Sequence, residues 1–260
     1  MKLHHVPASA GIQWVKLGIR TFFRQPLALA GLFFMFMLVV SVLSIVPVLG
    51  HALALALLPA ATLGLMAATR EAAAGQFPMP TVLASAFQAG RERVRAMLVL
   101  GAIYAAGSFV IMGLTALIAG TGPVAIDPEQ VESAGELLRQ PGVMRGLLVS
   151  LVLYVPLGLL FWHAPALVHW HGVSPAKSLF FSALACWTNK GALLVYFLGW
   201  TGVFFGVSLG LVLLATLLGG PKLLSLLLFP VAMLMSAMFF SSLYFTFRDS
   251  FTTDDGQAPA

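Results

Sequence analysis

Long apolar runs without any charged residue are the dominant pattern of this chain. No Asp, Glu, Lys or Arg occurs between residues 27 and 69. One membrane-spanning helix needs about 20 apolar residues, so this interval predicts two helices, with a turn near Pro47 and Gly50. Further charge-free intervals cover residues 96–126, 146–176, 191–221 and 223–247. We therefore predict an all-α membrane protein whose six transmembrane helices form three hairpins.

Composition strengthens the membrane assignment. Apolar residues make up 60% of the 260 positions and charged residues only 9%, whereas soluble domains carry about 25% charged residues. The mean hydropathy is +0.97. This small number of charged residues cannot cover a surface that faces water. The bilayer is therefore the expected solvent. The net charge of +5 does not indicate a nucleic-acid partner, because the charges lie beside the apolar runs, as membrane anchors do.

The distribution of basic residues predicts the orientation. With six spans, both termini lie on the same side of the membrane. Of the 14 Lys and Arg residues, all but Arg139, Arg145 and Lys222 fall in segments on that side. Loops rich in Lys and Arg stay in the cytoplasm. We expect a multi-pass membrane protein with cytoplasmic N and C termini.

Each hairpin is preceded by an amphipathic segment that starts near a proline: Pro7, Pro80 or Pro175. Their polar stripes predict three cytoplasmic helices that lie in the membrane plane, with basic side chains on anionic lipid headgroups. The third stripe is the weakest. The anchoring residues that we single out are Lys16, Arg20, Arg24, Arg91 and Arg95.

These segments suggest a repeated unit of one in-plane helix and two spans, over residues 7–69, 80–168 and 175–247. The alternative is that any short connection between spans becomes amphipathic without duplication. We treat residues 1–260 as one membrane domain and expect a disordered tail over 249–260. The sequence Asp127-Pro128-Glu129 starts a further predicted helix, on the periplasmic surface.

Small residues recur at every fourth position in two predicted spans and indicate close helix packing. Packing between spans of this chain is the first explanation, and dimerisation through the fifth span is the alternative. We expect Gly206→Leu to damage folding or assembly. The positions are Ala60, Gly64 and Ala68 in the second span, and Gly202, Gly206 and Gly210 in the fifth.

Histidines supply the main candidate for a polar site. His163, His169 and His171 lie near the end of the fourth span, but no two are four residues apart and no carboxylate accompanies them. A metal site needs three or four convergent ligands, so an interfacial role beside Trp170 is the simpler interpretation. We expect no metal and no cofactor. No nucleophile–base set or phosphate-binding loop appears, so we expect no enzyme.

The N-terminal pattern Gly11-x2-Trp14-x3-Gly18-x3-Phe22-x3-Pro26 resembles the opening of a family of bacterial six-span inner-membrane proteins whose function is unassigned. The resemblance extends over most of the chain. It implies the inner membrane of a Gram-negative bacterium and is consistent with six spans. It implies no catalytic or binding residues.

Two functional hypotheses follow. The first is a membrane-organising or partner-binding component, whose partners are anionic membrane lipids and either a second copy or another membrane protein. The alternative is a channel or carrier for a neutral or lipid-like solute, using spans bent by Pro59, Pro156, Pro165 and Pro230. We favour the first because no span carries a charged residue in its middle, which ion-coupled transport normally requires.

Overall fold

The computed structural model describes residues 2–119, 142–218 and 220–252. In this part of the chain, six helical segments are long and apolar enough to cross a membrane. The prediction of an all-α protein with six spans is confirmed. The spans are α2 (Pro26–Ser44), α3 (Leu49–Ala73), α5 (Arg91–Ala119), α7 (Val143–Phe161) continued by α8 (Ala164–His171), α10 (Lys190–Leu218) and α11 (Gly220–Ser250).

Shorter elements connect the spans. Helices α1 (Ala10–Arg24) and α9 (Pro175–Thr188) occupy the first and third predicted amphipathic segments. Whether either helix lies in the membrane plane stays a prediction. The second segment differs from its prediction: it contains only η1 (Pro80–Ala84) and α4 (Ser85–Gln88). Gly90, with φ +91°, separates α4 from α5, because a left-handed residue stops a helix. Arg91 and Arg95 therefore belong to a span.

The chain ends meet in a two-stranded antiparallel pair. Strand β1 (Lys2–Leu3) lies beside β2 (Phe251–Thr252), with Leu3 opposite Phe251. Asp249 and Ser250 are still in α11, so the predicted disordered tail at 249–260 is wrong for its first residues. Residues 253–260 and the predicted helix at Asp127 lie outside the described residues.

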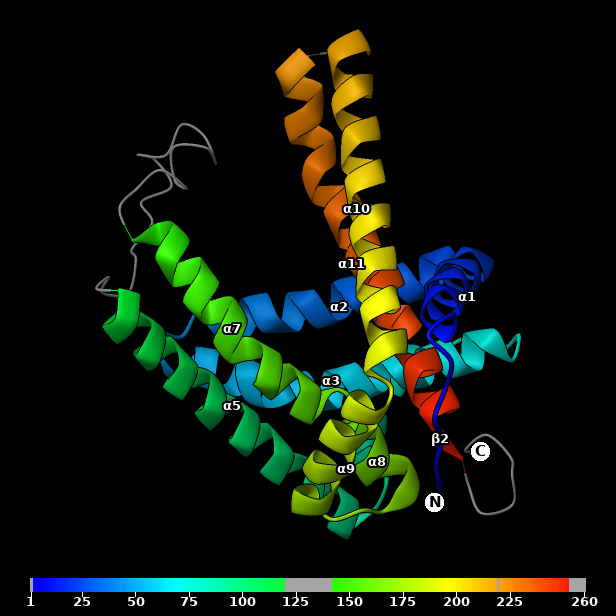
Figure 1. Ribbon diagram of the computed structural model, residues 1–260, viewed down its shortest axis with the longest axis vertical. Helices are drawn as coiled ribbons and strands as arrows, with labels where there is room; N and C mark the ends of the chain where they lie inside the picture. The colour runs from blue at the N-terminus through cyan, green and yellow to red at the C-terminus, as the bar shows by residue number, and fades with distance from the viewer. Residues whose placement is uncertain (1, 120–141, 219, 253–260) are drawn as a thin grey trace.

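The third hairpin projects away from the other two, which pack against each other through α3 and α5 (Figure 1). Helix α1 packs against α10 and α11, while α11 also packs against α2 and α3. The C-terminal half of α11 is the centre of the core, because residues 241–247 are all buried. By contrast, the outer halves of α10 and α11 project away from the other helices, and Leu217 and Phe229 there are 81% and 67% exposed. The threefold repeat stays a prediction.

Candidate functional site: a polar hub and an apolar groove

Helix α1 lies against the third hairpin through the residues of the N-terminal pattern. A Cβ added to Gly11 would overlap the carbonyl oxygen of Ala192 in α10, and one added to Gly18 would overlap Ser242 in α11. Between these glycines, Trp14 has no exposed surface. The pattern that carries the family resemblance is therefore the contact face that holds α1 in place.

Hydrogen bonds between side chains complete this contact. Trp14 Nε1 donates to Asp249 Oδ2 at 2.8 Å, and Arg248 Nε pairs with Asp249 Oδ1 at 2.8 Å. Nearby, Ser242 Oγ donates to the Phe239 carbonyl oxygen. Its oxygen therefore accepts from the Tyr196 hydroxyl at 2.6 Å.

The Trp200 indole Nε1 donates to the same Ser242 oxygen at 3.1 Å. Buried polar groups stabilise a fold only when they are paired, and each of these donors reaches an acceptor. We call Trp14, Tyr196, Trp200, Ser242 and Asp249 the polar hub.

Asn189 joins both ends of the chain to the junction of α9 and α10. Its side-chain Oδ1 accepts from the Val6 backbone N–H at 3.0 Å, and its Nδ2 donates to the His4 carbonyl at 3.0 Å. The His4 N–H in turn donates to the Ser250 carbonyl. Asn189 is 2% exposed. Its buried side-chain amide therefore fixes the segment around His4 and Val6, which is distant in the sequence.

A side chain from α9 is inserted where α7 ends and α8 begins. In a continuous helix the His163 N–H would donate to the Leu159 carbonyl. Here the His163 N–H donates to Ser182 Oγ at 2.9 Å, and that hydroxyl donates to the Leu159 carbonyl at 2.8 Å. Ser182 thus bridges a broken turn, and Pro165 begins the next helix.

The three candidate histidines do not converge on one point. The His163 ring packs at 5.4 Å from the Phe251 ring, whereas His169 packs at 6.3 Å from Trp170. His163 and His171 each lie 5.9 Å from the Phe247 ring. In the described parts of the chain, no cluster of at least three His, Cys, Asp or Glu residues has metal-binding geometry. His163 is 2% exposed and its Nδ1 has no hydrogen-bond partner.

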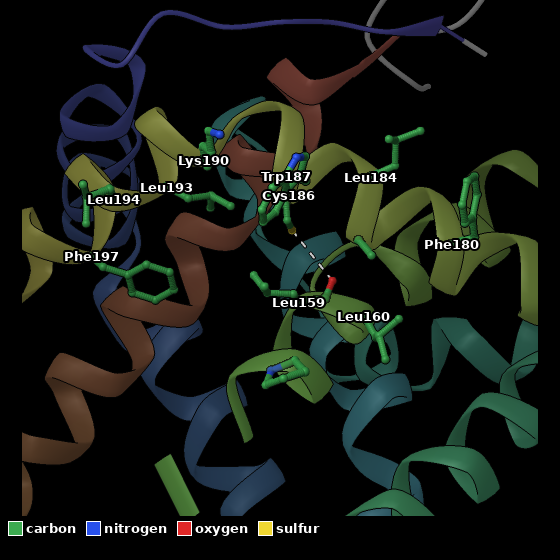
Figure 2. A pocket seen from close by; sticks show the side chains of 12 residues that line it. Leu159, Leu160, Phe180, Leu184, Cys186, Trp187, Lys190, Leu193, Leu194 and Phe197 are labelled. Carbon is green, nitrogen blue, oxygen red and sulfur yellow. Dashed lines mark hydrogen bonds between the residues drawn. The ribbon is translucent and has the colours of Figure 1, made fainter. Parts of the chain in front are cut away.

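An apolar groove runs between α7, α9 and α10 (Figure 2). Its volume of about 690 Å³ lies within the range of about 300–1,000 Å³ that is typical of ligand sites. Pro156, Leu159 and Leu160 of α7 form one wall, and Leu193 of α10 contributes to another. The remaining lining residues are Phe180, Ala183, Leu184, Cys186, Trp187, Lys190, Leu194 and Phe197.

One charged residue lines this groove. Lys190 is the first residue of α10, and its Nζ lies 4.9 Å from the centre of the Trp187 ring. Cys186 sits deeper, with its Sγ 3.7 Å from the Leu159 carbonyl oxygen. Burial raises the pKa of the Cys186 thiol to about 12, so it stays protonated and inert at neutral pH. Sequence reasoning missed this groove, because its walls come from three separate helices.

The two small-residue stripes have different surroundings. Gly64 of α3 lies against the backbone of Leu83, and Ala60 and Ala68 are buried. Along α10, a Cβ added to any of the three glycines would meet no described atom within 4 Å. The described helices thus leave the glycine face of α10, defined by Gly202, Gly206 and Gly210, uncovered.

The predicted basic anchors are exposed: Lys16, Arg20 and Arg24 on α1, and Arg91 and Arg95 at the start of α5. Arg24 also donates to the Ala73 carbonyl at 3.3 Å, so it links α1 to the end of α3. These positions are accessible to lipid headgroups, and their binding to lipid stays a prediction.

Comparison with known proteins places the chain in a family. No family model matches it, and no solved structure matches it. A probable inner membrane protein of Burkholderia thailandensis is 36% identical over 269 aligned positions, which cover 100% of this chain and 97% of the relative. Together with the six apolar helices, this similarity identifies a multi-pass inner-membrane protein. The chain belongs to the family of that probable inner membrane protein.

Proposed function

We propose that this protein is a membrane-organising component that associates with a second copy of itself through α10. The observation that carries the proposal is the uncovered glycine face of α10, where no described atom lies within 4 Å of a Cβ added to Gly202, Gly206 or Gly210. Glycines at this spacing let the backbones of two membrane helices approach closely. They offer little apolar side-chain surface to lipid, so a second helix fits this face better than acyl chains do.

The projection of the third hairpin away from the other two supports the same proposal. The outer half of α10 contacts α11 but is open on its other sides (Figure 1). Leucine and phenylalanine side chains flank the glycine face, among them Phe205 and Leu209, which are 71% and 49% exposed. If the α10 helix of a second copy packed on these glycines, Phe205 and Leu209 would contact the sides of that second helix.

Cysteine cross-linking in native membranes tests this association. In a Cys186→Ala background, which removes the only native cysteine, we expect Gly206→Cys to form a disulfide-linked dimer on mild oxidation. Gly113→Cys is the matched control, because Gly113 is also a helical glycine in a span with nothing within 4 Å. Equal cross-linking of the two variants would mean random collision and would contradict the proposal.

Gly206→Leu separates assembly from folding. An added Cβ meets no described atom within 4 Å, so we expect an unchanged unfolding temperature for the monomer in detergent. The dimer fraction in membranes, measured by single-molecule photobleaching, should fall strongly. A dimer fraction equal to that of the wild type would overturn the assignment of α10 as the interface.

We also propose that both termini lie in the cytoplasm. The support is the excess of Lys and Arg in the segments on the terminal side. A green fluorescent protein fused after Ala260 should fluoresce, and alkaline phosphatase fused there should be inactive. The reverse pair of results would invert the topology.

A carrier of lipid-like solutes is the second candidate function. The apolar groove between α7, α9 and α10 favours it, because a carrier of apolar molecules needs an apolar site at membrane depth. Reconstitution in vesicles with a fluorescent lipid tests it: faster exchange between leaflets than in protein-free vesicles supports a carrier, and an unchanged rate contradicts it.

A further inference from the structure

We infer that the groove between α7, α9 and α10 is a binding site for an anionic phospholipid, with one acyl chain in the groove and the phosphate on Lys190. This inference goes beyond self-association through α10 and does not depend on it. It rests on the depth, lining and charge of the groove.

The groove starts at the membrane boundary. The fifth span begins at Lys190, and lysine and tryptophan are the side chains that mark the interface of a bilayer. From Lys190 the lining continues along α10 to Phe197, which is about 10 Å of helix. A lipid headgroup at Lys190 therefore has its acyl chain beside the rest of the groove.

Acyl chains are the matching occupant for the inner part. Leu160, Leu193 and Phe197 are among its apolar walls. An empty space of this size would forfeit the dispersion contacts of its lining, and water would find no partners among these side chains. Some of the apolar lining residues are exposed, such as Leu194, 61% exposed. An acyl chain can therefore enter the groove sideways from the bilayer.

The polar end selects the headgroup. Among the described residues that line the groove, Lys190 is the one with a charged side chain, and its ammonium lies over the Trp187 ring. The indole is 70% exposed, which leaves this pair open to a headgroup. A single cation of this kind attracts an anionic phosphate near a membrane surface.

Native mass spectrometry of the full-length protein in mild detergent tests the site. The probes are phosphatidylglycerol and phosphatidylcholine with identical acyl chains. We expect the wild type to retain one phosphatidylglycerol in preference to phosphatidylcholine. Lys190→Gln should weaken retention of phosphatidylglycerol about fivefold. Lys222→Gln makes the same charge change in the first turn of α11 and should have no effect.

A second variant tests the acyl chain. Ala183→Trp fills part of the groove and should reduce retention of both lipids. Equal retention of the two lipids by the wild type, or an unchanged preference in Lys190→Gln, would refute the headgroup assignment. Undiminished retention by Ala183→Trp would refute the acyl-chain assignment.

Fluorescence quenching gives an independent readout without altering the groove walls near α7. The signal of Trp187 is the difference between the wild type and Trp187→Phe. In phosphatidylcholine nanodiscs with a small fraction of brominated phosphatidylglycerol, we expect this signal to be quenched more than random mixing allows. Quenching at the random level would overturn the proposal even if Ala183→Trp fails to fold.

Discussion

Gly18 and Gly31 are both helical glycines, yet only Gly18 lies against another helix. A Cβ on Gly18 would overlap Ser242, whereas one on Gly31 would meet nothing within 4 Å. The same residue type therefore has a packing role at one position and none at the other. The difference is set by α11, which is more than 200 residues away in the chain.

We predict that Gly18→Ala destabilises the protein by about 1–3 kcal/mol, because overpacking forces α1 away from α11. Gly31→Ala should be neutral or slightly stabilising, because alanine favours a helix over glycine. Unfolding temperatures in detergent measure both. Equal effects of the two changes would contradict the close contact of α1 and α11.

Cys186 supplies a pH-dependent prediction. Its folded pKa is about 12, above the value near 8.5 of a free thiol, so the folded protein keeps the proton that an unfolded chain loses. Since the thiolate is the reactive form, alkylation in intact membranes should be slow at pH 7.5 and should rise steadily up to pH 10. In detergent-unfolded protein the rate should level off near pH 9. A plateau below pH 9 in intact membranes would contradict the burial of this thiol.

Sequence reasoning singled out one residue of the polar hub, Trp14, and two glycines of the same contact face, but not their partners. Gly11, Trp14 and Gly18 stand out by their regular spacing on one helix. Asn189 and Ser182 carry no such signal, because each is a single polar residue whose partners come from distant segments. The three histidines attracted attention by proximity in sequence, but in the described residues they form no metal-binding group.

At the scale of elements, the break between α7 and α8 has a definite cause. Pro165 lacks an N–H group, and the Ser182 hydroxyl satisfies two backbone groups that the break would otherwise leave unpaired. The prolines inside the spans were predicted to bend helices, and Pro165 lies in the first turn of α8. The inserted serine could not be predicted, since it requires knowing that α9 packs on α7.

We predict that Ser182→Ala destabilises the protein by about 1–3 kcal/mol or more, because it leaves the His163 N–H and the Leu159 carbonyl without a partner in the interior. Ser182→Thr keeps the hydroxyl and should retain more of the stability. Ser236→Ala is the control, since that serine bonds only to the carbonyl of Ala232 in its own helix. Thermal unfolding in detergent measures the stability of each variant. A loss of stability in Ser182→Ala as small as that in Ser236→Ala would contradict the bridge.

At the scale of the whole molecule, the number of spans followed directly from charge-free intervals, because no charged residue is stable in the middle of a bilayer without a partner. The projection of the third hairpin away from the other two did not follow from the sequence. It depends on which helices contact one another at the base, and those contacts include close approaches at glycines and single hydrogen bonds between segments that are distant in the sequence.

The clamp at Asn189 predicts how the chain ends behave. Asn189→Ala removes the partners of the Val6 N–H and the His4 carbonyl, so we expect faster amide hydrogen exchange over residues 2–6. Exchange in the spans should not change. Gln13→Ala, at an exposed position of α1, is the control. Mass spectrometry of the exchanged peptides measures both, and unchanged protection over residues 2–6 would contradict the clamp.

The pairing of β1 with β2 has a consequence for biogenesis. The ribosome releases Leu3 long before Phe251, yet the two residues lie opposite each other in the folded protein. Likewise, the face of α1 that carries Gly11 and Gly18 can be covered only after α10 and α11 have been made. Helix α1 is therefore made long before it can dock, and a nascent chain stalled before the third hairpin keeps the contact face of α1 available to insertion factors.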